Sequence, residues 1–247
     1  ENYLKIAENE KQNSGILKQY TQEAIDEANM AIKTSVPYVK DEVKGVWLRP
    51  TETTEDQIIN TLEILKANGF NNVFLETYFH GKTIFPSKVM NKYGFTVQNE
   101  KFENIDPLAI WIKEAHKRDM KVHIWFQSFY VGNTPSEYNP SSILAVRPDW
   151  GNKTKRYANQ PKATKSTAEH NGFFLDPANP QVQEFLIELI NEIIAEYKPD
   201  GINLDYIRYP ITTTGSDMDS WGYTDYARND FKAQFGKDPI ELTPSDV

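Results

Sequence analysis

The side chains best suited to chemistry stand near the ends of four short apolar segments. Arg49 lies in the first segment, Glu76 in the second, Gln127 in the third and Asp205 in the fourth. Carboxylates can transfer protons or act as nucleophiles, and guanidinium and amide groups can bind hydroxyl groups. These residue types indicate acid–base or nucleophilic chemistry on a polar substrate if the fold brings the four segment ends together.

Four β-strands are predicted, each as a short apolar run between polar or turn-forming residues. They cover residues 44–49, 72–78, 121–129 and 201–209. A helix with apolar residues at helical spacing is predicted after each strand. The helices are expected over residues 54–68, 108–118, 180–197 and 226–235. This alternation indicates parallel βαβ units.

Capping residues mark the starts of three of these helices. Thr54 with Gln57 three residues later forms a capping-box pattern. Asp106 and Asn179 each precede a proline, which suits the first turn of a helix.

Residues 1–41 are predicted as a separate N-terminal helical segment that ends near Val36-Pro37, and residues 42–247 as the strand-bearing domain.

Neighbouring residues of each predicted strand differ in character, because side chains alternate between the two faces. Ile202 and Leu204 are aliphatic, for example, whereas Asn203 and Asp205 are polar. An open sheet covered on both faces would be apolar throughout, and no glycine-rich phosphate turn follows the first strand. We therefore predict an α/β fold, a (β/α)8 TIM barrel, rather than a doubly wound sheet.

The polar or aromatic faces of the strands should converge at one mouth of this barrel. The residues expected there are Arg49, Glu76, Tyr78, Trp125, Gln127 and Asp205. Charges are costly to bury unless they are paired. An interior ion pair of Arg49 with Glu76 or with Asp205 is therefore the structural alternative to a chemical role.

Several stretches carry a resemblance to a known family. They are Glu42–Leu48, Asn72–Glu76, Asp106–Leu108, Glu114–Arg118, Val122–Phe126, Leu175–Pro180 and Asp200–Pro210. In this order and spacing, residues 42–240 resemble the family 10 glycosyl-hydrolase-like proteins. The resemblance implies a (β/α)8 barrel that acts on a bacterial cell-wall or envelope polysaccharide, outside the cell or in its envelope. It also implies an acid at the end of the fourth strand, which is Asp205.

The chain departs from this family at two positions. Tyr206 stands where a second acid is common, and Glu76 where a glutamine is common. Glycoside hydrolysis usually needs two carboxyl groups. Asp205 is expected to be the nucleophile or base, or to orient a substrate acetamide that attacks in its place. Glu76 is the acid candidate within this chain, and an acid from further sequence is an equal alternative.

Substrate-binding roles are expected for the remaining polar and aromatic residues. These are Arg49, Trp47, Tyr78, His80, Trp125, Gln127, Asp176, Arg208 and Tyr209. Core packing is the alternative for the two tryptophans, and shaping of a turn is the alternative for Asp176.

The chain is expected to carry only the first half of the barrel. A complete barrel of this type takes about 250 residues or more, and residues 42–247 hold only the four predicted strands. The unpaired strand edges of a half barrel could associate with a partner.

Composition argues against several other classes. The net charge is −8 with no dense basic patch, which disfavours nucleic acid as a partner. The absence of cysteine excludes disulfides and thiol nucleophiles. No apolar run approaches the roughly 18 residues of a membrane span. No cofactor and no metal are predicted.

Two other functions compete with hydrolysis. A metal-dependent polysaccharide deacetylase could use His80, His123, Glu76 and Asp205 as ligands, although no His-x-His or His-x3-His pair exists. A glycan-binding barrel without catalysis would agree with Tyr206 in place of an acid.

Overall fold

The computed structural model describes Lys5, residues 14–35, Val39 and residues 42–133, 142–212 and 219–246. Two compact units divide the chain, Glu1–Glu42 and Val43–Val247. The first unit contains helix α2 (Ser14–Ser35), which falls within the predicted helical segment. The predicted end of that segment at Val36-Pro37 lies outside the described residues.

The second unit is built on a parallel sheet whose strands follow the order of the chain. The strands β1 (Gly45–Leu48), β2 (Asn72–Phe79), β4 (Lys121–Gln127) and β5 (Gly201–Asp205) pair in that sequence. A short strand, β3 (Lys82–Thr83), turns back antiparallel onto the end of β2. The strand order never reverses, so the sheet lacks the switch point of a doubly wound fold.

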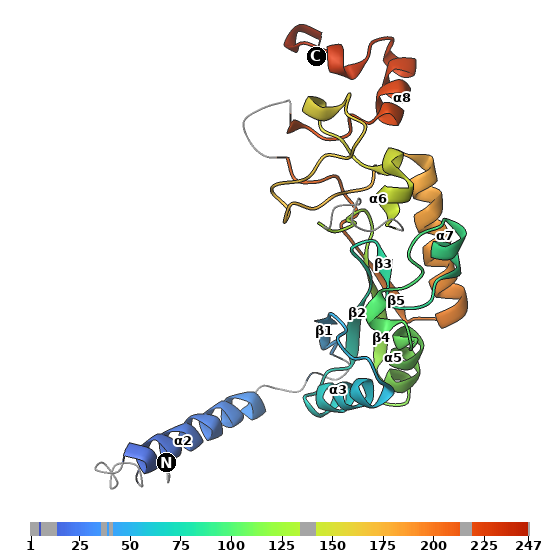
Figure 1. Ribbon diagram of the computed structural model, residues 1–247. Coiled ribbons are helices and arrows are strands. Elements are labelled where there is room, and N and C mark those ends of the chain that lie inside the picture. The colour runs from blue at the N-terminus through green and yellow to red at the C-terminus, as the bar shows by residue number, and fades with distance from the viewer. Residues whose placement is uncertain are drawn as a thin grey trace. The chain divides into compact units, whose positions relative to one another are not determined.

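Three helices connect successive strands and lie on one side of the sheet (Figure 1). They are α3 (Glu55–Ala67), α5 (Pro107–His116) and α7 (Pro180–Tyr197), and each contacts the next in the series. The opposite face of the sheet is therefore free of these helices. This is the arrangement of the first four units of a (β/α)8 barrel, and it confirms the predicted fold class.

The apolar core lies between the sheet and the three helices. It contains fully buried aliphatic and aromatic residues from every layer, among them Leu62, Val73, Leu75, Trp111, Val122, Ile124, Val182 and Leu189. The predicted aliphatic faces of β2 and β4 are thus the helix-facing ones. The predicted helix caps are also present: Thr54, Asp106 and Asn179 each accept a backbone N–H of the following turn.

The connections contain short elements that the periodicity of the sequence does not reveal. They are α4 (Lys88–Lys92), η1 (Glu100–Phe102), α6 (Ile143–Val146), η3 (Pro148–Trp150), η4 (Lys155–Tyr157), η6 (Pro239–Glu241) and η7 (Pro244–Asp246). The helix after β5 is α8 (Asp225–Phe235), close to its predicted bounds. Among the described helices, none combines the length and the apolar content needed to cross a membrane.

Strand β5 is shorter than predicted and forms one edge of the sheet. It ends at Asp205 because Tyr206 takes a left-handed backbone conformation with φ of 49°, which breaks the extended chain. Within the described residues, β1 and β5 each pair with one strand only. Trp47 on β1 and Leu204 on β5 are 57% and 41% exposed. Association through these edges stays a prediction.

Tyr78 does not lie at the mouth, and this prediction of its place is wrong. Glu76 pairs with Trp125, but Tyr78 pairs with Phe126 because the register shifts between them. An extra residue in one strand reverses the alternation of faces beyond it. Tyr78 is therefore fully buried on the helix-facing side, where its ring stacks on Phe126 with centroids 4.6 Å apart.

The buried hydroxyl of Tyr78 has no hydrogen-bond partner among the described residues, and burial raises the pKa of this side chain. A buried polar group without a partner costs about 1–3 kcal/mol. We expect Tyr78→Phe to raise the free energy of unfolding by about 1 kcal/mol in urea denaturation. The matched control is Tyr197→Phe, which should lower it, because the Tyr197 hydroxyl donates to Asp106 Oδ2 at 2.8 Å. Equal losses in both variants would contradict this account.

Candidate active site

The carboxyl ends of the strands bring Glu76 together with Arg49 and Gln127. Arg49 donates from Nε to Oε2 of Glu76 and from Nη2 to Oε1 at 2.9 Å. Gln127 Nε2 donates to the same Oε1 at 2.9 Å. The Glu76 side chain has no exposed surface. The interior ion pair considered as a structural alternative is therefore present, with Glu76 rather than Asp205 as the partner of Arg49.

Asp205 differs from Glu76 in burial, because it is a partly exposed residue. Trp125 Nε1 donates to Oδ2 at 2.8 Å, and the backbone N–H of Tyr206 donates to Oδ1 at 2.8 Å. Asp205 pairs in register with Gln127 and so lies on the polar face of the sheet. A carboxylate accepts about four hydrogen bonds, so these two donors orient the group and leave each oxygen able to accept another.

Arg49 and Trp125 connect the two carboxylates. The Arg49 guanidinium lies over the Trp125 ring, 5.9 Å from its centroid, and the indole in turn donates to Asp205. The hydrogen bond to Glu76 raises the pKa of Arg49, so the guanidinium stays charged. The two carboxylates are thus held on either side of a fixed cation and an indole.

Tyr206 and Tyr130 form an aromatic wall beside Asp205, in which the two rings stack with centroids 4.9 Å apart. The Arg208 guanidinium lies 5.1 Å from the centroid of the Tyr206 ring. Arg208 Nη2 donates to Oε1 of the buried Glu169 at 2.7 Å. A left-handed conformation at a non-glycine residue costs about 1–3 kcal/mol, and such residues cluster at functional sites.

Three residues around Asp205 were not predicted as site residues: the wall residues Tyr130 and Tyr206, and Glu169, which binds Arg208. Tyr130 follows the third predicted strand and Tyr206 follows Asp205 directly, so the strand ends contained a signal for both. Glu169 lies in a long polar connection without periodicity, where the sequence offers no comparable signal.

His80 lies at the same rim, whereas Trp47 and His123 lie one row further into the sheet. The backbone N–H of His80 donates to Gln127 Oε1 at 3.3 Å, and burial lowers the pKa of the His80 ring. Trp47 stacks on Phe74 at 4.3 Å between centroids, and Phe74 stacks on His123 at 4.7 Å. This row is continuous across β1, β2 and β4.

Asp176 is fully buried and holds two loops together. Its Oδ1 accepts the N–H of Ala178 at 3.0 Å, and its Oδ2 accepts the hydroxyl of Thr224 at 2.5 Å. Burial raises the pKa of this carboxyl group. Asp176 has no surface at the mouth, so the structure agrees with its alternative role in shaping the turn. Tyr209 is 41% exposed and lies beyond the end of β5.

The histidines and carboxylates proposed as metal ligands do not gather in one place. Across the described residues, no group of three or more such side chains could hold a metal ion. His123 Nε2 instead makes a hydrogen bond with Asn72 Oδ1 at 2.7 Å. The described part of the chain therefore offers no set of metal ligands for the deacetylase hypothesis.

The family is shown by a direct match. The profile of the glycosyl hydrolase-like 10 family covers residues 21–239. The chain belongs to this family. Relatives of this chain include the glycosyl hydrolase DigH of Escherichia coli K12, 27% identical over 61% of this chain, and the glycosyl hydrolase YngK of Bacillus subtilis, 24% identical over 80% of it. The match spans 34% of DigH and 40% of YngK, well under half of either relative.

Solved structures share the fold of this glycosyl hydrolase-like 10 chain at low sequence identity. An α-L-fucosidase of Paenibacillus thiaminolyticus aligns with a TM-score of 0.55 at 18% identity, over 80% of this chain and 27% of the fucosidase. A chitobiase of Flavobacterium johnsoniae aligns with a TM-score of 0.51 at 17% identity, over 80% of this chain and 27% of the chitobiase. A hypothetical protein of Ruminiclostridium thermocellum aligns with a TM-score of 0.51 at 18% identity, over 81% of this chain and 93% of that protein. These likenesses support the barrel-type fold alone.

Proposed function

We propose that this chain provides a catalytic carboxylate of a glycoside hydrolase that acts on a bacterial cell-wall or envelope polysaccharide, outside the cell or in its envelope. One observation carries the proposal. Asp205 is a partly exposed residue at the end of β5, and its carboxylate is oriented by Trp125 and by the N–H of Tyr206, beside an aromatic wall. Family membership supports the glycosidase class, and the substrate is our inference.

Asp205 is the proposed nucleophile or base. Its free acceptor positions can face the anomeric carbon or a water molecule. The glycosidic C–O bond breaks, a general acid protonates the leaving oxygen, and water supplies the hydroxyl group that the anomeric carbon finally carries. With an N-acetyl hexosamine as substrate, the acetamide attacks instead and Asp205 orients it.

Glu76 is a less suitable general acid in this arrangement. Both of its oxygens accept hydrogen bonds from Arg49 or Gln127, and its side chain has no exposed surface. A general acid must carry a proton and reach the leaving oxygen. We therefore propose that Glu76 positions Arg49, and that a different carboxyl group protonates the leaving oxygen.

Exposed side chains around Asp205 supply the proposed contacts to sugar. The Arg49 and Arg208 side chains are 60% and 46% exposed, so both guanidinium groups can donate to hydroxyl groups or to a carboxylate. Trp125 offers a ring face to the apolar C–H surfaces of a pyranose. These contacts would place the sugar over Asp205.

A second candidate function is a glycan-binding barrel without catalysis. It is favoured by one observation: Glu76 and Glu169, the carboxylates of the described site besides Asp205, are both paired with arginine. Such a protein would bind the same polysaccharide and leave it intact.

Incubation of the complete gene product with purified bacterial sacculi separates these functions. We expect new reducing ends, counted by a colorimetric assay, and soluble saccharides identified by mass spectrometry. Binding to sacculi without new reducing ends would overturn hydrolysis in favour of the glycan-binding barrel. Release of acetate without chain cleavage, lost after chelation of metals, would indicate the deacetylase instead.

A further inference from the structure

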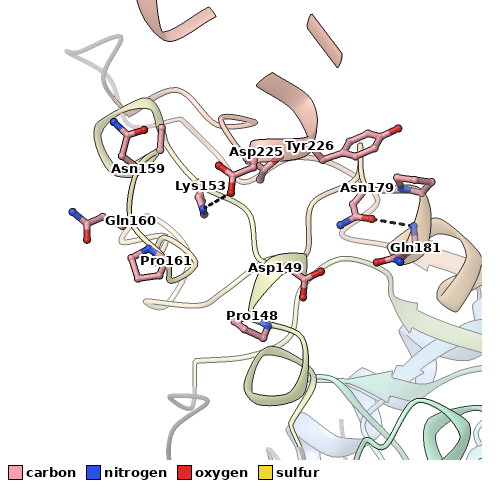
Figure 2. Close-up of a pocket in the computed structure, with 13 residues that line it drawn as sticks. Pro148, Asp149, Lys153, Asn159, Gln160, Pro161, Asn179, Gln181, Asp225 and Tyr226 are labelled. Atoms are coloured by element: carbon pink, nitrogen blue, oxygen red, sulfur yellow. Dashed lines mark hydrogen bonds and ion pairs between the residues drawn. The ribbon is translucent and has the colours of Figure 1, made fainter. Parts of the chain in front are cut away.

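A pocket of about 850 Å³ lies apart from the candidate active site (Figure 2). The segment 158–161 forms one side and the start of α7 forms the other, with the start of α8 and the residues Pro148-Asp149 completing the wall. The volume falls within the roughly 300–1,000 Å³ of small-molecule pockets. Neither Asp205 nor Glu76 nor the residues that hold them line this pocket.

Three side chains in the pocket wall have hydrogen-bond donors to spare. The Lys153 side chain is 8% exposed, and within the described residues its amine has only an ion pair with Asp225 at 3.8 Å. The Gln181 carbonyl oxygen accepts from Arg147 and from Trp150 Nε1, which leaves its NH2 group without an acceptor in the described part of the chain. Fixed amides and a buried amine thus present donors to an occupant.

Asn159 repeats this arrangement on the opposite wall. Its Oδ1 accepts from Arg228 Nη1 at 3.2 Å, so its NH2 group is also left as a donor. Because both amide oxygens are anchored by arginines, the two donor groups are oriented before any ligand arrives, which lowers the entropic cost of binding.

Two carboxylates supply acceptors in the same pocket, and both are paired with cations. Asp149 pairs with Arg147 at 2.8 Å, and Asp225 lies 3.8 Å from Lys153 and 3.9 Å from Arg228. Because these charges offset one another, the pocket favours neither an anion nor a cation. A hydroxyl group both donates and accepts, so a neutral polyhydroxylated molecule matches this mixed set.

Apolar surface completes the lining. Pro148, Pro161 and Pro180 contribute rings to the wall, and Tyr226 contributes a ring that is 45% exposed. Flat apolar surfaces interleaved with amides and carboxylates suit a sugar, which has C–H faces as well as hydroxyl groups.

The pocket is built by the two loops that leave the carboxyl ends of β4 and β5. The buried hydrogen bond between Asp176 and Thr224 joins these loops, and Asn152 Oδ1 accepts the N–H of Gly222 at 3.1 Å between them. Thr224 also caps α8, whose first turn lines the pocket. The pocket therefore belongs to the same end of the sheet as Asp205.

We propose that this pocket is a second, non-catalytic glycan-binding site that holds a neutral N-acetylhexosamine segment of the polysaccharide. The proposal rests on the proposed function for its choice of sugar. Its occupant is recognised by the NH2 groups of Asn159 and Gln181, by the Lys153 amine and by the Tyr226 ring.

Native mass spectrometry of the complete gene product tests the pocket separately from catalysis. The parent protein carries Asp205→Asn, so that chitotetraose, the neutral probe, is bound without being cleaved. We expect up to two chitotetraose molecules per chain for the parent and one for the pocket variant Gln181→Ala/Tyr226→Ala. The matched control is Gln183→Ala/Tyr157→Ala, with one change in the same turn of α7 and one at a tyrosine that is 47% exposed. It should bind two.

Each result has a defined meaning. An unchanged number of bound chitotetraose molecules in the pocket variant, or no binding by the parent, overturns the pocket. Pocket-dependent binding of tetragalacturonate, an acidic tetrasaccharide, overturns the neutral class of ligand. If the parent binds one molecule and the pocket variant none, the pocket stands and the binding of sugar at Asp205 fails. If the wild type cleaves sacculi but the pocket variant binds like the parent, the pocket alone fails.

Discussion

Replacement of Asp205 by asparagine is expected to lower kcat/KM for the release of reducing ends by roughly 10²–10⁴-fold. Asparagine keeps the size of the side chain and can still accept the indole N–H of Trp125, which donates to Oδ2 at 2.8 Å. It cannot take up a proton or attack the anomeric carbon. The loss should therefore appear in turnover, while the free energy of unfolding, measured by urea denaturation, stays within about 1 kcal/mol of the wild type.

The chain offers a matched control for this substitution five residues earlier. Asp200 immediately precedes β5, where its Oδ2 accepts the N–H of Val122 at 2.8 Å and lies 2.8 Å from His116 Nε2. Asp200→Asn makes the same chemical change at the opposite end of the strand from Asp205. It should retain activity. Equal activity of the Asp205→Asn variant and the wild type would remove Asp205 from the mechanism.

Local chemistry accounts for the parts of the fold that are predictable from the sequence. Thr54, Asp106 and Asn179 each cap a helix by a contact within the next few residues, which short-range patterns reveal. The alternation of Val73 with Phe74, or of Ile202 with Asn203, identifies the two faces of a strand for the same reason. These two features are enough to predict the barrel-type fold and to place Asp205 on its polar face.

The errors arise where pairing between distant segments decides the outcome. The register shift that turns Tyr78 toward Phe126 is a property of β2 against β4, and nothing in either strand alone shows it. Glu169 reaches the site through its contacts with Arg208 and the N–H of Ile211, about forty residues along the chain. The sequence likewise does not decide whether Arg49 pairs with Glu76 or with Asp205, because the choice depends on the register of the strands.

The ion pair of Arg49 with Glu76 leads to the second large expected effect, on stability. The two partners are not equivalent, because the Arg49 side chain is 60% exposed and the Glu76 side chain has no exposed surface. Removal of Arg49 leaves an uncompensated charge in the interior, which costs about 3–5 kcal/mol. Removal of the Glu76 charge leaves a guanidinium that can turn to water, so the cost is smaller, about 1 kcal/mol.

We therefore expect Arg49→Met to lower the free energy of unfolding at pH 7 by about 3–5 kcal/mol, and Glu76→Gln by about 1 kcal/mol. The double variant Arg49→Met/Glu76→Gln should recover most of the stability lost by Arg49→Met, because no buried charge remains. Urea denaturation of the wild type, the two single variants and the double variant gives the interaction energy of the pair by a double-mutant cycle.

The two single variants also test how Glu76 is held. Equal destabilisation by Arg49→Met and Glu76→Gln would show that Glu76 is not held as a buried charge, and would return it to consideration as the general acid.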